Sequence, residues 1–136
     1  MHKHRVVAIL IGLAVFTAPG LCSARIGETL RECESRYGVV LKVINHSWPD
    51  YPEYCFKFGD VEIRVRLYKG VSAQEAFHIP GRMLTNHQVQ EILRKNGAGT
   101  EKITSHHITL PDHSDVLIVG TREFEKIFRK DIGTGF

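Results

Sequence analysis

The chain has 136 residues, 43% hydrophobic and 24% charged, which suits one modest globular domain. Its formal charge of +3 includes two cationic residues of an amino-terminal leader, Lys3 and Arg5, so residues 25–136 carry only +1. Interspersed charge of this size lacks the electrostatic footprint of a nucleic-acid binder or of a polybasic membrane-surface protein. We therefore expect no nucleic-acid partner and a single domain over residues 25–136.

Residues 1–24 have the layout of a secretory signal peptide. A basic start precedes an apolar run of 13 residues, Val6 to Ala18, and small residues at the end predict cleavage after Ala24. The run is shorter than the roughly 20 residues that a membrane-spanning helix needs, so we expect no stable membrane span after cleavage. A lipoprotein cut before Cys22 is the alternative, which the bulky Leu21 disfavours. The leader predicts a periplasmic or secreted protein.

The first predicted element of the mature chain is a short helix. Thr29 and Glu32 form a capping box, apolar residues at positions 30, 33 and 37 share one face, and Gly38 ends the helix. The β-branched run that follows, Val39 to Ile44, predicts a strand.

A hairpin around Gly59-Asp60 is the clearest pattern in the chain. A second turn at Lys69-Gly70 returns the chain as a third strand over residues 71–78, with Glu75 opposite Arg64. The first hairpin has a two-residue loop, which predicts the pairs Phe58 with Val61, Phe56 with Ile63, Tyr54 with Val65 and, on the other face, Lys57 with Glu62.

The carboxyl-terminal half predicts two more helices. A second capping box and an apolar stripe predict a helix over residues 85–96. A third helix is predicted after Thr121, which caps its start, and Gly133 ends it. Residues 116–119 read as a buried strand, and residues 102–109 are compatible with a short one. The whole pattern predicts an α+β fold: a short helix, an antiparallel β-meander, a second helix, an additional strand and a carboxyl-terminal helix.

Cleavage of the leader leaves two cysteines, Cys33 and Cys55. In an oxidising compartment such a pair is a disulfide candidate, and closing a loop of about 23 residues stabilises a fold by roughly 3 kcal/mol. Two independent thiols are the alternative. The hairpin places Cys55 on the face opposite the aromatic residues, so the bond requires the first helix to pack on that face or at the sheet edge.

Imidazole and carboxylate side chains are concentrated at His106, His107, Asp112, His113 and Asp115. These groups suit zinc or copper, which would make the chain a periplasmic metal-binding protein. On an extended segment, however, His106 and His107 point to opposite faces, and a solvated loop explains the same residues. No other cofactor is expected.

Trp48, Tyr51 and Tyr54 flank two prolines and form a candidate binding patch. Aromatic side chains in a stiffened loop suit an interface anchor, although they also suit packing back over the sheet. The chain contains no nucleotide-binding loop, metalloprotease motif or serine-hydrolase motif, and we expect no enzyme activity. The leading hypothesis is a non-catalytic domain that binds another envelope or secreted protein through the sheet or this loop.

Residues 24–38, ARIGETLRECESRYG, resemble the start of a group of small exported bacterial proteins of uncharacterised function. A more distant resemblance is to outer-membrane assembly lipoproteins of the SmpA/OmlA type, with a β-lactamase-inhibitor-like fold. That second resemblance implies a scaffold or protein-binding role in the envelope. The residues that match the first group are Gly27-Glu28-Thr29, Cys33, Arg36-Tyr37-Gly38, Lys69-Gly70, Leu84-Thr85 with Val89, and Gly135-Phe136.

Overall fold

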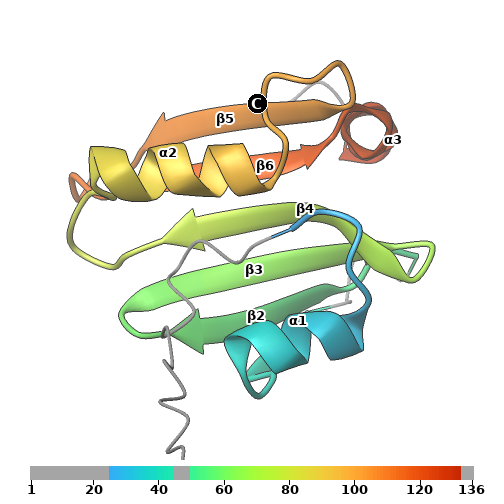
Figure 1. Ribbon diagram of the computed structural model, residues 1–136, viewed down its shortest axis with the longest axis horizontal. Helices are drawn as coiled ribbons and strands as arrows, with labels where there is room; N and C mark the ends of the chain where they lie inside the picture. Colours follow the sequence, from blue (N-terminus) through green and yellow to red (C-terminus); the bar gives the residue numbers. More distant parts are fainter. Residues whose placement is uncertain (1–24, 45–49, 133–136) are drawn as a thin grey trace, which may run out of the picture.

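The computed structural model describes residues 25–44 and 50–132, which form a six-stranded antiparallel sheet and three helices (Figure 1). The strand order is β1-β2-β3-β4-β6-β5. The strands are β1 (Lys42–Ile44), β2 (Glu53–Phe58), β3 (Val61–Tyr68), β4 (Val71–His78), β5 (Ile103–Thr109) and β6 (Asp115–Thr121). The helices are α1 (Leu30–Tyr37), α2 (Asn86–Lys95) and α3 (Arg122–Ile132). The predicted α+β class and the order of its elements are confirmed.

Helices α1 and α2 lie over the same face of the sheet, which we call the inner face, with α1 near β2 and α2 near β5 and β6 (Figure 1). There Tyr37 and Ile92 pack with buried strand residues such as Phe56, Phe77 and Leu117. Helix α3 packs on the outer face, where its Phe124 and Phe128 meet a second, smaller apolar cluster. Helices therefore pack on both faces of the sheet, but α3 covers only part of the outer face and the main core lies under α1 and α2.

Both predicted capping boxes are present. Thr29 and Glu32 exchange backbone and side-chain hydrogen bonds at the start of α1, and Thr85 and Gln88 do the same at α2. Each box satisfies two backbone N–H groups that a helix start leaves free, so these short helices begin at defined residues.

The β2–β3 hairpin has the predicted register. All four predicted pairs are formed, from Phe58 with Val61 at the turn to Tyr54 with Val65. Gly59 supplies the positive φ of 62° that the tight turn requires. Apolar side chains on one face and Lys57 beside Glu62 on the other leave this hairpin no equally good alternative pairing.

The β3–β4 hairpin departs from its predicted register by one residue. From the turn, Tyr68 pairs with Val71 and the next pair is also regular, but the ladder then skips Ala73. This bulge places Glu75 opposite Val65, so the predicted pair of Glu75 with Arg64 is wrong. The shift moves Glu75 from the outer face to the inner face of the sheet.

The sheet extends further than a single additional strand after α2. Residues 103–109 and 115–121 form the hairpin β5–β6, with β6 next to β4 and β5 at the edge. At the opposite edge, only residues 42–44 of the predicted strand 39–44 pair with β2. Both edges are therefore single strands with one hydrogen-bonded neighbour each in the described sheet.

Some predictions concern residues outside the described ranges. They are the signal peptide over residues 1–24, Trp48 in the candidate patch, the helix end at Gly133 and the Gly135-Phe136 match. Among the described helices, none combines the length and the apolar character that crossing a membrane requires.

Candidate functional site

The histidines of β5 point away from each other, as the strand geometry predicts. His106 Nε2 lies 3.0 Å from Glu125 Oε1 of α3, on the outer face. His107 contacts the carboxylate of Asp115 on the inner face, and that carboxylate also accepts the Leu84 N–H at 2.7 Å. Asp115 is fully buried, so these contacts satisfy a buried charge and join the β5–β6 hairpin to the chain before α2.

The β5–β6 turn holds the other predicted metal ligands, Asp112 and His113. The Asp112 carboxylate accepts the N–H of Ser114 at 3.0 Å and also its hydroxyl, while His113 has a positive φ of 64°. Across the described residues, no group of three or more His, Cys, Asp or Glu side chains is placed to hold a metal ion. The structure thus disperses the predicted metal ligands over three separate contacts.

A chain of Glu62, His78 and Ser114 matches an acid–histidine–serine triad in residue type. His78 Nδ1 lies 3.5 Å from Glu62, and its Nε2 lies 3.0 Å from the Ser114 hydroxyl. Ser114 is fully buried, however, and its proton is donated to Asp112, so the hydroxyl is neither accessible nor free for attack. This arrangement joins β4 to the β5–β6 turn.

The predicted disulfide between Cys33 and Cys55 is not formed, and both thiols are free. Cys33 is buried under α1 on the inner face, whereas Cys55 pairs with Arg64 and therefore lies on the outer face. The first helix packs on the aromatic face, which is the arrangement that separates the two thiols. Burial raises the pKa of Cys33 to about 12, so its thiol is unreactive while α1 is docked.

The two described aromatics of the candidate patch lie on opposite faces. Tyr51 is buried against α3, with its ring centroid 5.3 Å from that of Phe124, and its hydroxyl donates to Asp131 at 2.6 Å. Tyr54 is partly buried against the main core on the inner face. Tyr51 and Tyr54 therefore do not belong to one exposed surface.

The apolar edge, residues 39–44, is a surface that the sequence did not single out. Val39, Leu41 and Val43 are 82%, 66% and 43% exposed along the β1 side of the sheet. In this run Lys42 is the one charged residue. Natural sheets guard such edges with charges, prolines or bulges, because an unpaired edge accepts a further strand. The β-branched run predicts a strand, but this pattern alone does not show that the strand lies at an edge with its apolar side chains exposed.

A buried carboxyl group lies under α1. Glu75 is fully buried, its Oε2 accepts the Tyr37 hydroxyl at 3.2 Å, and its Oε1 has no hydrogen-bond partner among the described residues. Burial raises the pKa of Glu75 to about 7, against the opposing effect of the Tyr37 hydrogen bond. Sequence reasoning missed this group because the regular hairpin register placed it on the surface.

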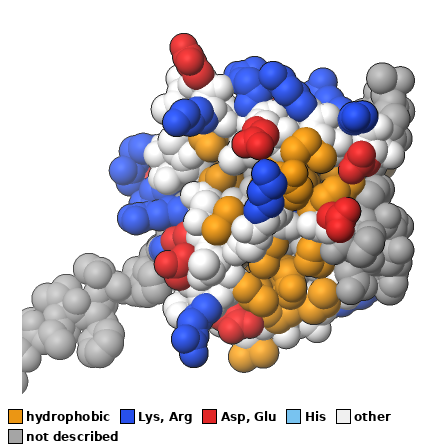
Figure 2. All heavy atoms as spheres, turned by 90° about the vertical axis from the view of Figure 1, so that its right-hand side faces the viewer, with side chains coloured by type: hydrophobic (Ala, Val, Ile, Leu, Met, Phe, Trp, Pro, Cys, Tyr) orange, Lys and Arg blue, Asp and Glu red, His pale blue; other side chains and the backbone are white. Residues whose placement is uncertain are grey.

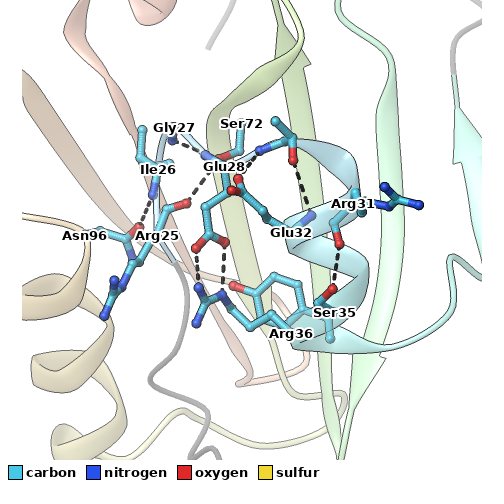
Figure 3. Close-up of polar contacts among 12 residues, drawn as sticks. Arg25, Ile26, Gly27, Glu28, Arg31, Glu32, Ser35, Arg36, Ser72 and Asn96 are labelled. Atoms are coloured by element: carbon cyan, nitrogen blue, oxygen red, sulfur yellow. Dashed lines mark hydrogen bonds and ion pairs between the residues drawn. The ribbon is translucent and has the colours of Figure 1, made fainter.

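The segment before α1 is fastened to the fold by side chains from distant elements (Figure 3). The Ser72 hydroxyl accepts the N–H groups of Gly27 and Glu28, each at 3.0 Å, and the Ile26 N–H donates to Asn96 at 2.9 Å. Within the same region, Arg36 of α1 pairs with Glu28. The start of α1 is thus held by polar contacts, and its body rests on the buried residues Cys33 and Tyr37.

Figure 2 shows one side of the molecule on which hydrophobic side chains gather among charged ones. Taken together, the fold and its sites define an α+β domain with an exposed apolar edge and a buried, half-satisfied carboxyl group.

Comparison with known proteins adds no relative: no family model, curated protein or solved structure matches this chain.

Proposed function

We propose that this chain is a non-catalytic, exported binding domain that docks an extended segment of another envelope or secreted protein along the apolar edge. The observation that carries the proposal is that Val39, Leu41 and Val43 are exposed in and just before β1, the strand at one edge of the sheet. The leader over residues 1–24 supports export to the periplasm or beyond the cell.

Strand addition at this edge joins two kinds of interaction. A partner strand hydrogen-bonds to the outer backbone groups of β1, and its apolar side chains cover the exposed row. Full burial of an aliphatic side chain stabilises by roughly 1.5 to 3 kcal/mol, before the entropy of ordering the partner is subtracted. Three such side chains give an interface of useful affinity from a short segment.

The opposite edge lacks these features. Strand β5 presents threonine, serine and histidine side chains, and its one strongly exposed large hydrophobic residue is Ile108, at 44%. An unpaired backbone is therefore common to both edges, whereas the apolar row belongs to β1. This contrast makes β5 the matched control surface.

Site-specific photocrosslinking in the producing cells tests the proposal. A photoreactive amino acid at Leu41 should give one discrete protein adduct, and the same amino acid at Ile108 should not. Val43→Lys should lower the Leu41 adduct at least tenfold, while Ile108→Lys leaves it unchanged. Both lysines replace exposed side chains, so stability should shift by no more than about 0.5 kcal/mol. Equal adducts at both edges, no adduct, or lipid adducts alone would overturn the proposal.

A further inference from the structure

The bulge in β4 buries an acid where an outward-facing ion pair was expected. A regular ladder from the Lys69-Gly70 turn would place Glu75 beside Arg64 on the outer face. Skipping Ala73 reverses the direction of Glu75, which then lies between Val65 and Val119 of the neighbouring strands. Bulges of this kind are often found where a side chain is aimed for a function.

Among the described residues, few groups face Glu75, and none of them is a free cation. From the sheet, the cross-strand neighbours Val65 and Val119 are apolar. From α1, Tyr37 donates one hydrogen bond, and the Cys33 thiol lies nearby. The remaining charges are Glu28 and Arg36, which pair with each other: Glu28 disfavours ionisation of Glu75, and Arg36 favours it. An ionised Glu75 would therefore be a buried charge with one hydrogen bond.

Helix α1 is the described element that covers this carboxyl group. Polar contacts hold the segment before it, but the helix itself has few buried residues. It has 8 residues, of which Cys33 and Tyr37 are buried. The Tyr37 ring contacts Phe56 at a centroid distance of 5.6 Å. Elements with few buried contacts open locally at less cost than the whole domain.

We propose that Glu75 is a proton-dependent latch for α1: the neutral carboxyl group allows α1 to close on the sheet, and the ionised group favours its release. Release of α1 exposes the ionised Glu75 carboxylate to water. It also uncovers Cys33, Tyr37 and the inner face around Phe56. This inference does not depend on the apolar edge, although that edge begins one residue after Gly38 and its start would be freed together with α1.

The direction of the pH effect follows from proton linkage. In the closed state Glu75 titrates near 7, and in the open state it returns to its ordinary value of 4.5, so opening releases a proton between these two values. The opening equilibrium constant should rise about tenfold per pH unit in that window and be constant outside it. A group that stabilises α1 when protonated thus loses its effect as the pH rises toward neutrality.

Amide hydrogen exchange of the purified protein tests the latch. The probes are the Cys33 and Gly38 N–H groups, which donate to Thr29 and Glu34 within and at the end of α1. After correction for intrinsic exchange, the opening of α1 should depend less on low urea concentrations than the opening of β4 and β6. The equilibrium constant for opening α1 should rise about tenfold per pH unit up to about pH 7. Glu75→Gln should abolish the pH dependence. A single opening shared by α1 and the sheet, or a pH-independent α1 opening, would overturn the proposal.

A second variant and a second probe keep the test independent of how well Glu75→Gln folds. Glu53 is also buried but is paired with Arg66 at 2.7 Å, so Glu53→Gln should leave the pH dependence of α1 unchanged. In the unmodified chain, alkylation of Cys33, followed by peptide mass spectrometry and normalised to a free thiol peptide, should accelerate about tenfold per pH unit in the same window. A normalised Cys33 rate that does not change with pH would also contradict the latch.

Discussion

Asp115 and Glu75 are both fully buried carboxyl groups on the inner face of the same sheet, yet their surroundings differ. Asp115 accepts a backbone N–H from Leu84 and contacts His107, so each of its oxygens has a partner. Glu75 has one hydroxyl donor at 3.2 Å, and its other oxygen has no partner in the part of the chain that the structure describes. Equal burial therefore produces a fully hydrogen-bonded structural contact at Asp115 and a partly satisfied, titratable group at Glu75.

The position of each residue in the sheet explains this difference. Asp115 begins β6, where the chain before α2 passes close by and can offer a backbone donor, and where the half-exposed His107 reaches solvent. Glu75 lies in the middle of β4, whose backbone groups are engaged with two neighbouring strands. Within the described ranges, the hydrogen bond to Glu75 comes from the covering helix, where Tyr37 supplies one donor.

The largest effect on the free energy of unfolding should come from removing the Asp115 carboxylate. Asp115→Ala leaves the Leu84 N–H without its acceptor and His107 without its carboxylate, and should lower the free energy of unfolding by about 3 kcal/mol. Asp115→Asn is the matched control, because the amide oxygen still accepts the N–H and should preserve part of that stability. Urea unfolding at neutral pH measures both. Equal losses in the two variants would show that the backbone acceptor is unimportant.

The next largest effect on the free energy of unfolding is a gain, at neutral to alkaline pH, when Glu75 is replaced by a neutral residue. The Glu75 carboxyl titrates near 7 when folded and at its ordinary value of 4.5 when unfolded, so the wild-type protein loses stability as the pH rises through this interval. Glu75→Gln should therefore be more stable than wild type by roughly 3 kcal/mol at about pH 8, and nearly equal to it at about pH 4. Urea unfolding across this range gives the difference, and a constant difference between the two proteins would refute the assignment.

The smallest effect concerns the partly exposed histidine. His107→Ala removes one contact of Asp115, but its side chain is 43% exposed, so screening limits the loss of stability to about 1 kcal/mol or less. His106→Ala provides the control on the same strand, since its Glu125 partner also pairs with Arg129. A larger loss from His106→Ala than from His107→Ala would mean that the buried carboxylate gains little from its histidine.

The β2–β3–β4 meander shows how much of the fold could be predicted from the sequence. The β2–β3 register follows from a two-residue turn and a strict alternation of apolar and polar residues, and all four predicted pairs are formed. In β4 the small residue Ala73 fits either a regular or a bulged ladder, so the alternation carries no sign of the skipped residue. That single uncertainty concealed the burial of Glu75.

The candidate sites could be predicted less well than the fold, for two physical reasons. His106 and His107 were grouped by their closeness in sequence, but a strand sends neighbours to opposite faces and each found a separate acid. The predicted disulfide between Cys33 and Cys55 depended on which face of the sheet the first helix covers, and the sequence around neither cysteine determines that packing. Strong local patterns thus predicted the elements, while the sites depended on contacts between distant elements.

The polar fastening of the segment before α1 has a consequence for the order of folding. Gly27 and Ser72 are 45 residues apart, and Ile26 and Asn96 are 70 apart, so both contacts close long loops. They cannot form until β4 and α2 exist, whereas each sheet hairpin needs only its own turn. In a chain synthesised from its amino end, α1 is therefore made early and docked late. Until it docks, the part of the inner face around Phe56 that α1 covers stays exposed, and a chaperone would find its binding surface there.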